Sequence, residues 1–261
     1  MVLPQSIRSL LGDEAYKTDG MGMSQASVLL FPDKVLKCQS PSEESENEAK
    51  MLRFLQGKLP VPQVYAYERA NGTDYLLMER CTGEMACTDR YLSDPALLCR
   101  LLANGLKALW AVDIRDCPAD WRLDHKLAQA AYNVKNGLVD VDNVEPDTFG
   151  PKGFRDPGHL LDWLMTHRPT EEPTLSHGDF CLPNLFGEGD RVTGFIDLGR
   201  TGVADKWCDV ALCCRSLRWN FDGVYGGKPY PGYDDGLLFR ELGISPDWDK
   251  IRYYILLDEL F

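Results

Sequence analysis

Three polar residues follow one another at fixed spacing in the last third of the chain. Asp179 is followed five residues later by Asn184, and Asp197 ends an apolar run thirteen residues after Asn184. Transfer of a phosphoryl group from a nucleotide needs such a set, because one carboxylate accepts or orients the proton of the attacking hydroxyl while an amide oxygen and a second carboxylate hold Mg²⁺. Asp, Asn and Gly also form simple turns, but a turn does not require this spacing. The pattern therefore predicts a phosphoryl-transfer site with Asp179 as the base and Asn184 and Asp197 as metal ligands.

A lysine and a glutamate in the first fifth of the chain can complete the nucleotide site. Lys37 closes a predicted strand, and Glu48 lies on the helix that follows, on the same face as the apolar residues Met51, Leu52 and Leu55. A carboxylate on an apolar face is expected only when it is paired. In kinases a strand lysine held by a helix glutamate contacts the α- and β-phosphates. The alternative is an unrelated surface lysine and a glutamate at a helix end.

A glycine-containing segment before the first predicted strand is a candidate phosphate-covering loop. Residues 20–24 read GMGMS, which begins like Gly-x-Gly-x-x-Gly, but Gln25 occupies the place of the third glycine. Ser24 and Ser27 can supply hydroxyl or backbone donors to phosphates. Ordinary turn chemistry is an equally good interpretation of the same residues.

The segment 75–82 is expected to connect two lobes. In a kinase the backbone of this segment hydrogen-bonds to adenine, which makes Cys81 a candidate nucleotide contact. Met78 is expected at the back of the pocket, although Met is as often ordinary core packing. We place the hinge at about residues 78–83.

Composition limits the classes of protein that the chain can belong to. It has 261 residues, of which 44% are hydrophobic and 26% charged, enough for one large domain or two small lobes. No apolar run approaches the roughly 20 residues of a membrane span, and the first residues lack the pattern of a signal peptide. Nine cysteines without Cys-x-x-Cys or zinc-ligand spacing are expected to be reduced thiols. We therefore expect a cytoplasmic protein without membrane partners.

The net charge of −12 is concentrated in the second part of the chain. Residues 81–261 carry 19 basic and 29 acidic groups, a net charge of −10, and residues 1–80 carry 9 and 11. A basic footprint for nucleic acid is absent. An acidic surface attracts cationic ligands, although many soluble proteins are acidic for no such reason.

Hydrophobic periodicity predicts a strand-rich first part and a helical second part. Strands are expected at 28–31, 35–37, 64–68 and 75–79, joined in pairs by turns at Pro32-Asp33 and Asn71-Gly72. One helix is expected between the two pairs of strands, with a capping box at Ser45 and Glu48. Helices are then expected at 95–112, 125–136, 157–167, 209–219 and 248–260, with a hairpin at 185–196 and loops at 139–156 and 222–236. The fold class is α+β, a two-lobed protein-kinase-like fold. A small antiparallel N-lobe spans residues 1–82, and a larger, mainly helical C-lobe spans residues 83–261.

The chain ends in a cluster of acidic groups. If the last helix persists, Asp258 and Glu259 join the free carboxylate of Phe261 in one negative patch. A helix C-terminus favours cations, so the patch is unfavourable unless a positive group arrives. A bound polyamine would supply it. The alternative is a frayed, solvated end.

Several motifs together resemble those of the aminoglycoside 3′-phosphotransferases. They are SHGDFCLPN at 176–184, GFIDLGRTGVADKWCD at 194–209, YYILLDELF at 253–261 and KLPVPQV at 58–64. The resemblance runs from about residue 16 to the end of the chain. It implies ATP-dependent phosphorylation of a hydroxyl on an aminocyclitol antibiotic, with a small polycationic substrate and a protein-kinase-like fold.

The same resemblance implies roles for individual residues. Lys37 and Glu48 match the phosphate-positioning pair, Asp179 the base, and Asn184 and Asp197 the ligands of two magnesium ions. The remaining matches lie in the antibiotic pocket or its support: Glu145, Asp147, Arg200, Arg215, Asp258, Glu259 and the carboxylate of Phe261.

Three departures from the family's pattern bear on ligand choice. Trp219-Asn220 stands where the most similar well-known relatives have an acidic pair, and residues 222–236 differ in composition from theirs. Val35 stands where an aromatic residue stacks on adenine, so we expect weaker nucleotide binding. Two alternatives stay open at this point: a kinase for another small alcohol, such as choline or a different antibiotic, and an inactive kinase-like binding module.

Overall fold

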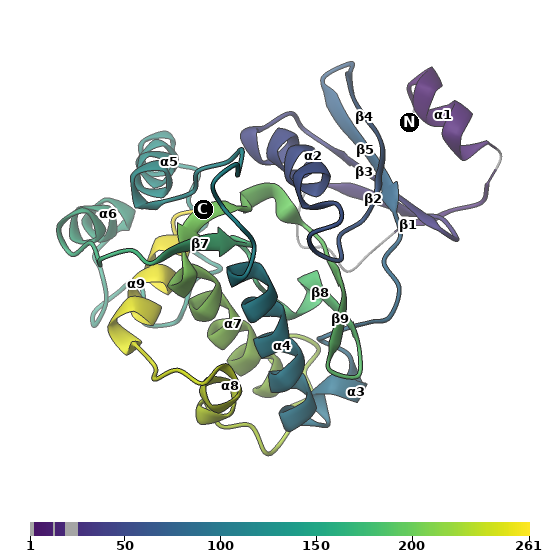
Figure 1. The fold of residues 1–261 in the computed structure, drawn as a ribbon. Coiled ribbons are helices and arrows are strands. Elements are labelled where there is room, and N and C mark those ends of the chain that lie inside the picture. The colour runs from purple at the N-terminus through teal and green to yellow at the C-terminus, as the bar shows by residue number, and fades with distance from the viewer. Residues whose placement is uncertain (1–2, 13, 19–25) are drawn as a thin grey trace.

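The computed structural model describes residues 3–12, 14–18 and 26–261, and it has two lobes (Figure 1). The smaller lobe holds a five-stranded antiparallel sheet in the order β1-β2-β3-β5-β4. The strands are β1 (Lys17–Thr18), β2 (Ser27–Leu30), β3 (Lys34–Gln39), β4 (Val64–Ala70) and β5 (Thr73–Glu79), and the helices of this lobe are α1 (Gln5–Leu11) and α2 (Glu43–Leu55).

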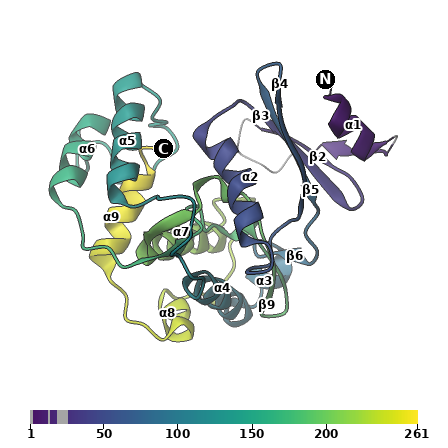
Figure 2. The same cartoon turned by 45° about the horizontal axis from the view of Figure 1, so that its top comes forward.

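The two helices of the smaller lobe cover opposite faces of its sheet (Figure 2). Alternate residues of a strand face opposite sides. On β5, Leu76 packs with the residues of α2, whereas Leu77 packs with Ile7 and Leu11 of α1. The second face of the sheet is thereby removed from water by a helix that the sequence did not predict.

Both hairpins predicted in the smaller lobe are confirmed. β2 pairs with β3 and β4 pairs with β5, both antiparallel. Asn71 and Gly72 have φ angles of 51° and 73° at the second turn. Two consecutive residues with positive φ give the turn whose twist matches that of the flanking strands.

The start of α2 differs from the prediction. The N-cap is Ser42, whose hydroxyl accepts from the backbone N–H of Ser45 at 3.0 Å, while the Ser45 hydroxyl accepts from the Ser42 N–H at 2.8 Å. The expected capping box of Ser45 and Glu48 is therefore wrong. The helix begins one turn earlier than expected, and this leaves the Glu48 carboxylate free to point away from the helix end.

The larger lobe is built on helices α4 and α7, which pack against α8 and α9 (Figure 1). Its helices are α3 (Asp89–Leu92), α4 (Pro95–Trp110), α5 (Leu123–Asn136), α6 (Pro157–Thr166), α7 (Lys206–Phe221), α8 (Gly236–Leu242) and α9 (Trp248–Asp258). Its strands are β6 (Glu84–Met85), β7 (Pro173–Ser176), β8 (Leu185–Glu188), β9 (Arg191–Phe195) and β10 (Gly202–Asp205), with 3₁₀ turns η1 (Leu182–Asn184) and η2 (Leu198–Arg200). Of these elements α3, α8, β6, β7, β10 and both 3₁₀ turns were not predicted.

One apolar core continues from α2 of the smaller lobe to α9 of the larger lobe. β5 ends at Glu79, and β6, which pairs with β8, begins at Glu84. The chain passes between the lobes in this interval, and the role of residues 78–83 as a hinge remains a prediction. Among the described residues, no helix is long and apolar enough to span a membrane. All nine cysteines are free thiols, as expected.

Candidate functional site

Asp179 lies on a short loop after β7, where two neighbours hold its carboxylate. The Cys181 thiol donates to Oδ1 at 3.0 Å, and the Asn184 amide donates to Oδ2 at 2.9 Å. Gly178 has a φ of 84°, and a Cβ there would lie 2.1 Å from the carbonyl oxygen of Arg200. Only glycine satisfies both conditions. The loop is thus fixed on both sides of Asp179, and the carboxylate keeps one orientation.

The oxygens of Asn184 and Asp197 are suited to a hard cation. The amide nitrogen of Asn184 is engaged by Asp179, and this leaves its amide oxygen available. Burial alone would raise the pKa of Asp197, but the Lys37 ammonium, 2.8 Å from Oδ1, outweighs it and lowers the pKa below its usual value. A charged carboxylate and a neutral amide oxygen are ligands that Mg²⁺ accepts, with its other positions filled by water or phosphate. The residues present therefore fit magnesium.

The backbone of Asp197 has an unusual conformation, of the kind found at functional sites. Its φ of 61° and ψ of 56° lie in the left-handed region, which costs a non-glycine residue about 1 kcal/mol or more. The amide of Asn47 in α2 donates to the carbonyl oxygens of Gly199 at 2.9 Å and Thr201 at 2.8 Å. These two hydrogen bonds hold the turn that follows Asp197 against the smaller lobe.

Lys37 and Glu48 form a buried pair, as the nucleotide-site prediction requires. The Lys37 ammonium lies 2.8 Å from Glu48 Oε2, and the side chains are 11% and 2% exposed. Burial opposes the charge on Lys37, but the carboxylates of Glu48 and Asp197 outweigh it and raise the pKa of the ammonium above its usual value. The alternative of an unrelated surface lysine and a helix-end glutamate does not describe this geometry. An ammonium held by two carboxylates is positioned to meet phosphate oxygens.

Asp209, which the sequence analysis did not identify as a functional residue, holds the loop that carries Asp179. It is buried near the start of α7 and accepts hydrogen bonds from the Ser176 hydroxyl at 2.9 Å and from the backbone N–H groups of His177 and Gly178 at 2.8 and 2.9 Å. A carboxylate that accepts one hydroxyl and two backbone N–H groups fixes the three residues that precede Asp179. The available signal was a single acid within an otherwise apolar run at 207–214.

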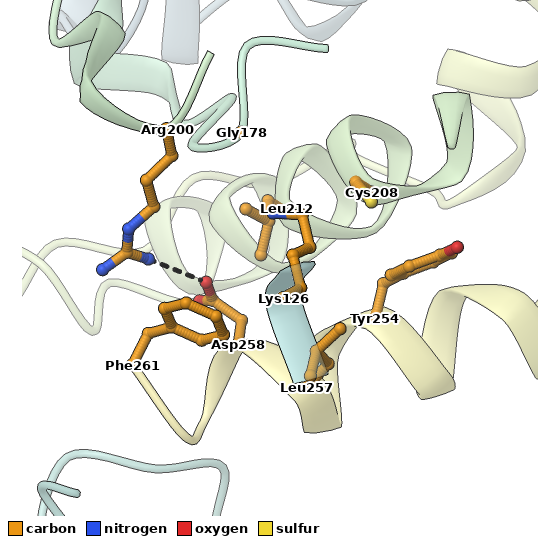
Figure 3. Close-up of a pocket in the computed structure, with 9 residues that line it drawn as sticks. All are labelled: Lys126, Gly178, Arg200, Cys208, Leu212, Tyr254, Leu257, Asp258 and Phe261. Carbon is orange, nitrogen blue, oxygen red and sulfur yellow. Dashed lines mark hydrogen bonds and ion pairs between the residues drawn. The ribbon is translucent and has the colours of Figure 1, made fainter. Parts of the chain in front are cut away.

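Arg200 connects the smaller lobe to the C-terminus of the chain, and Figure 3 shows its side chain beside Asp258 and Phe261. Its Nε donates to Glu44 Oε1 of α2 at 2.9 Å, and its Nη1 lies 3.3 Å from Asp258 Oδ1. The ring of Phe261 lies between two cations, with Arg200 Cζ at 4.9 Å and Lys126 Nζ at 5.9 Å from its centroid. Both are within reach of a cation–π contact, which fixes the last residue of the chain.

The predicted acidic patch at the C-terminus is partly neutralised by the protein itself. Asp258 pairs with both Arg200 and Arg215. Although its burial favours the neutral form, the two guanidinium groups keep the pKa of Asp258 below its usual value. The expectation that all three carboxylates await an external cation is therefore wrong for Asp258. The reason is that two arginines distant in sequence reach the end of α9.

Two hollows meet at Arg200. The smaller, of about 220 Å³, is lined by Lys37, Gln39, Glu44, Glu48, Asp179, Asp197, Gly199 and Arg200. The larger, of about 560 Å³, is lined by Asp140, Asp142, Asn143, Val144, Pro146, Arg200, Arg215, Trp219, Val224, Tyr225, Asp258, Glu259 and Phe261. The first contains the groups expected to bind phosphate and metal. The second joins acidic residues of the predicted loop at 139–156 to the C-terminus.

The remaining predicted residues differ in how close the structure brings them to these hollows. Neither Glu145 nor Asp147 lines either hollow. Glu145 donates its backbone N–H to Glu259 Oε1 at 3.1 Å, whereas Asp147 pairs with Arg252 at 3.1 Å. Ser27 lies in β2 opposite Cys38, and Ser24 falls outside the described residues.

Met78 and Cys81 lie where the connection between the lobes begins. Met78 is buried on β5 opposite Val35, and a Cβ on Gly194 would meet Cys81 Sγ at 2.5 Å. Their contact with a nucleotide remains a prediction.

Glu259 is expected to make stability depend on pH. Its burial raises the pKa to about 7, although the Glu145 N–H and Arg215 oppose this. Because the folded state keeps the proton that the unfolded state loses near pH 4.5, this contribution is full below pH 4.5 and is lost as the pH rises through 7. We expect the free energy of unfolding, measured by urea titration at pH 5 and pH 8, to fall by about 2 kcal/mol more in the wild type than in Glu259→Gln. Equal changes in the two proteins would show that Glu259 does not titrate in this range.

Comparisons with known proteins agree with the geometry. A family model described as the phosphotransferase enzyme family matches residues 23–254. An aminoglycoside 3′-phosphotransferase from Enterococcus faecalis is 44% identical over 255 residues, which cover 94% of this chain and 92% of that protein. The crystal structure of an aminoglycoside 3′-phosphotransferase of type VIII aligns with a TM-score of 0.78 at 27% identity, covering 98% of both chains. A structure from Streptomyces rimosus, an aminoglycoside phosphotransferase in complex with ADP and streptomycin, aligns with a TM-score of 0.79 at 24% identity, covering 97% of this chain and 95% of that one, and supports the fold.

Proposed function

The chain belongs to the phosphotransferase enzyme family and, within it, to the aminoglycoside 3′-phosphotransferases, and on this premise we propose that it phosphorylates an aminoglycoside antibiotic at its 3′-hydroxyl with ATP. Such a reaction inactivates the antibiotic and confers resistance. The observation that carries the proposal is the position of Asp179, whose oriented carboxylate lines the hollow that holds Lys37 and Asp197.

In the proposed reaction each group has one task. Lys37, held by Glu48 and Asp197, binds phosphate oxygens of the nucleotide. Asp179 accepts or orients the proton of the acceptor hydroxyl while that oxygen attacks the terminal phosphorus, and the bond from this phosphorus to the bridging oxygen breaks so that ADP leaves. Asn184 and Asp197 would hold magnesium, which when bound neutralises charge on the phosphates.

The larger hollow is the proposed site of the antibiotic. Asp140 and Asp142 of the loop present exposed carboxylates to it, and Glu259 of the C-terminus lies in its lining. These groups suit the ammonium groups of a small polycation, and the net charge of −12 favours its approach. We also propose a cytoplasmic location, where ATP is available and the free thiols stay reduced.

The decisive experiment compares aminoglycosides with and without the acceptor group. We expect kanamycin to be phosphorylated and its 3′-deoxy analogue to bind as a competitive inhibitor without turnover, because the two share their ammonium groups and differ in the attacking oxygen. Measurement of kcat/KM for both, with product analysis, tests this. Turnover of the 3′-deoxy analogue would refute the assigned position, and turnover of choline but of no aminoglycoside would refute the substrate class.

A further inference from the structure

Two aromatic side chains form one part of the lining of the larger hollow. Trp219 lies near the end of α7 and Tyr225 lies four residues beyond the helix, with ring centroids 5.5 Å apart and planes inclined by 59°. Tyr225 is 42% exposed and the neighbouring Val224 is 62% exposed. A contiguous apolar surface beside a concave site is typical of ligand binding.

Hydrogen bonds and an arginine hold this aromatic surface in place. The backbone N–H groups of Asp222 and Val224 donate to the carbonyl oxygens of Arg218 and Trp219 at 2.8 and 2.9 Å, so the segment folds back on the end of α7. The guanidinium of Arg215 lies 5.4 Å from the centroid of the Trp219 ring and is itself paired with Asp258. A surface fixed in advance loses little conformational entropy when a ligand binds.

The charges around the rings favour an uncharged partner over an ammonium group. Arg215 already interacts with the ring of Trp219 and is held there by Asp258, so this ring has a cation partner before a ligand arrives. The next residue, Asn220, offers no compensation, because its side chain is buried and donates to the Ser216 carbonyl oxygen at 2.8 Å. The carboxylates of the hollow come from other segments, at Asp140, Asp142 and Glu259.

Tyr225 lines the larger hollow, which meets the hollow of Asp179 at Arg200. Burial, together with the neighbouring Cys181 and Asp179, raises the pKa of its hydroxyl to about 12, so the phenol stays neutral at physiological pH. A sugar ring held in the larger hollow at this junction can direct its acceptor hydroxyl toward Asp179 in the smaller one.

We infer that Trp219 and Tyr225 form an aromatic wall that binds an uncharged, C–H-bearing face of this ring and so determines which aminoglycosides are accepted. The inference rests on the proposed function and goes beyond it. It assigns two sides to the substrate: ammonium groups toward the loop and the C-terminus, and an apolar ring face toward α7.

The first test is Trp219→Ala, with Trp248→Ala as a matched control. Trp248 is 45% exposed and has the Arg218 guanidinium 5.7 Å from its ring, but it lines neither hollow. We expect Trp219→Ala to raise KM for the aminoglycoside, and the Kd measured by calorimetry without ATP, about tenfold. The kcat, the KM for ATP and the melting temperature should stay near those of the control variant. Equal effects of the two variants, or less than a twofold change in Kd, would overturn the inference.

The second test uses neomycin B and paromomycin I, which differ by an amine or a hydroxyl on the ring that carries the 3′-hydroxyl. We expect Trp219→Glu to shift the ratio of their Kd values toward the amine-bearing compound by about fivefold or more, because a carboxylate there pairs with the added ammonium. An unchanged ratio of the two Kd values would overturn the inference that Trp219 contacts this ring.

The same measurements separate this inference from the proposed function. A wild type that binds these compounds but does not phosphorylate them refutes the function alone. The Kd ratios then still test whether Trp219 and Tyr225 contact the substrate ring. A wild type that neither binds nor phosphorylates them overturns both.

Discussion

Replacement of Asp179 by Asn is expected to lower kcat by a factor of about 10³ while the KM for ATP stays within about twofold. The amide keeps the size of the carboxylate and still accepts a hydrogen bond from one of its two partners, Cys181 or Asn184. It cannot take the proton of the acceptor hydroxyl. Steady-state kinetics with kanamycin, or with whichever aminoglycoside gives the highest turnover, measures both constants.

The matched control for this prediction is Asp190→Asn. Asp190 is an exposed aspartate in the turn between β8 and β9 and lines neither hollow. We expect its kcat to equal that of the wild type. A loss of less than tenfold in Asp179→Asn would contradict the assigned role, since a proton-accepting or orienting group contributes about 10² or more.

Replacement of Asp209 by Ala is expected to cost about 3 kcal/mol or more in the free energy of unfolding. The carboxylate accepts from three donors in a site closed to water, and its removal leaves the Ser176 hydroxyl and the N–H groups of His177 and Gly178 without that acceptor. The Gly178 N–H keeps the Ser176 Oγ as an acceptor at 3.2 Å, and each of the other two buried donors costs about 1–3 kcal/mol when it is left unsatisfied. Urea unfolding followed by circular dichroism gives the difference.

Activity and a surface control separate this effect from a general loss of charge. Because the three donors immediately precede Asp179, we expect kcat of the folded Asp209→Ala protein to fall as well. Asp162→Ala, at an exposed position of α6, should change the free energy of unfolding by about 0.5 kcal/mol or less. If Asp209→Ala were destabilised no more than Asp162→Ala, the supporting role of Asp209 would be wrong.

Sequence reasoning succeeded where the structural information is local. Hairpins such as the one at Asn71-Gly72 depend on the φ angles of adjacent residues, and helices such as α4 and α9 are visible in their own periodicity. It missed α1, whose seven residues have only Ile7 and Leu11 as buried anchors. So short a helix is stable only because the sheet supplies the opposing surface.

The charged side chains show the limit of local reasoning most clearly. An acidic end at Asp258 and Glu259 is visible in the sequence, but its pairing with Arg200 and Arg215 is not. Arg200 also binds Glu44, 156 residues earlier in the chain. Whether a carboxylate is free for a ligand depends on which cations the fold brings within about 4 Å of it. The separation of two residues along the chain does not predict their distance in space.

The sequence by itself determined the chemistry of this protein. The base, the metal ligands and the turns between them lie in one stretch from Asp179 to Asp197, where backbone geometry and spacing follow from neighbouring residues. Only the tertiary structure decided what supports and surrounds that chemistry: Asp209 beneath the loop, Arg200 between the lobes, and Trp219 and Tyr225 beside the larger hollow. The physical reason is that hydrogen bonds, ion pairs and ring contacts act over a few ångströms, and folding alone brings distant residues that close.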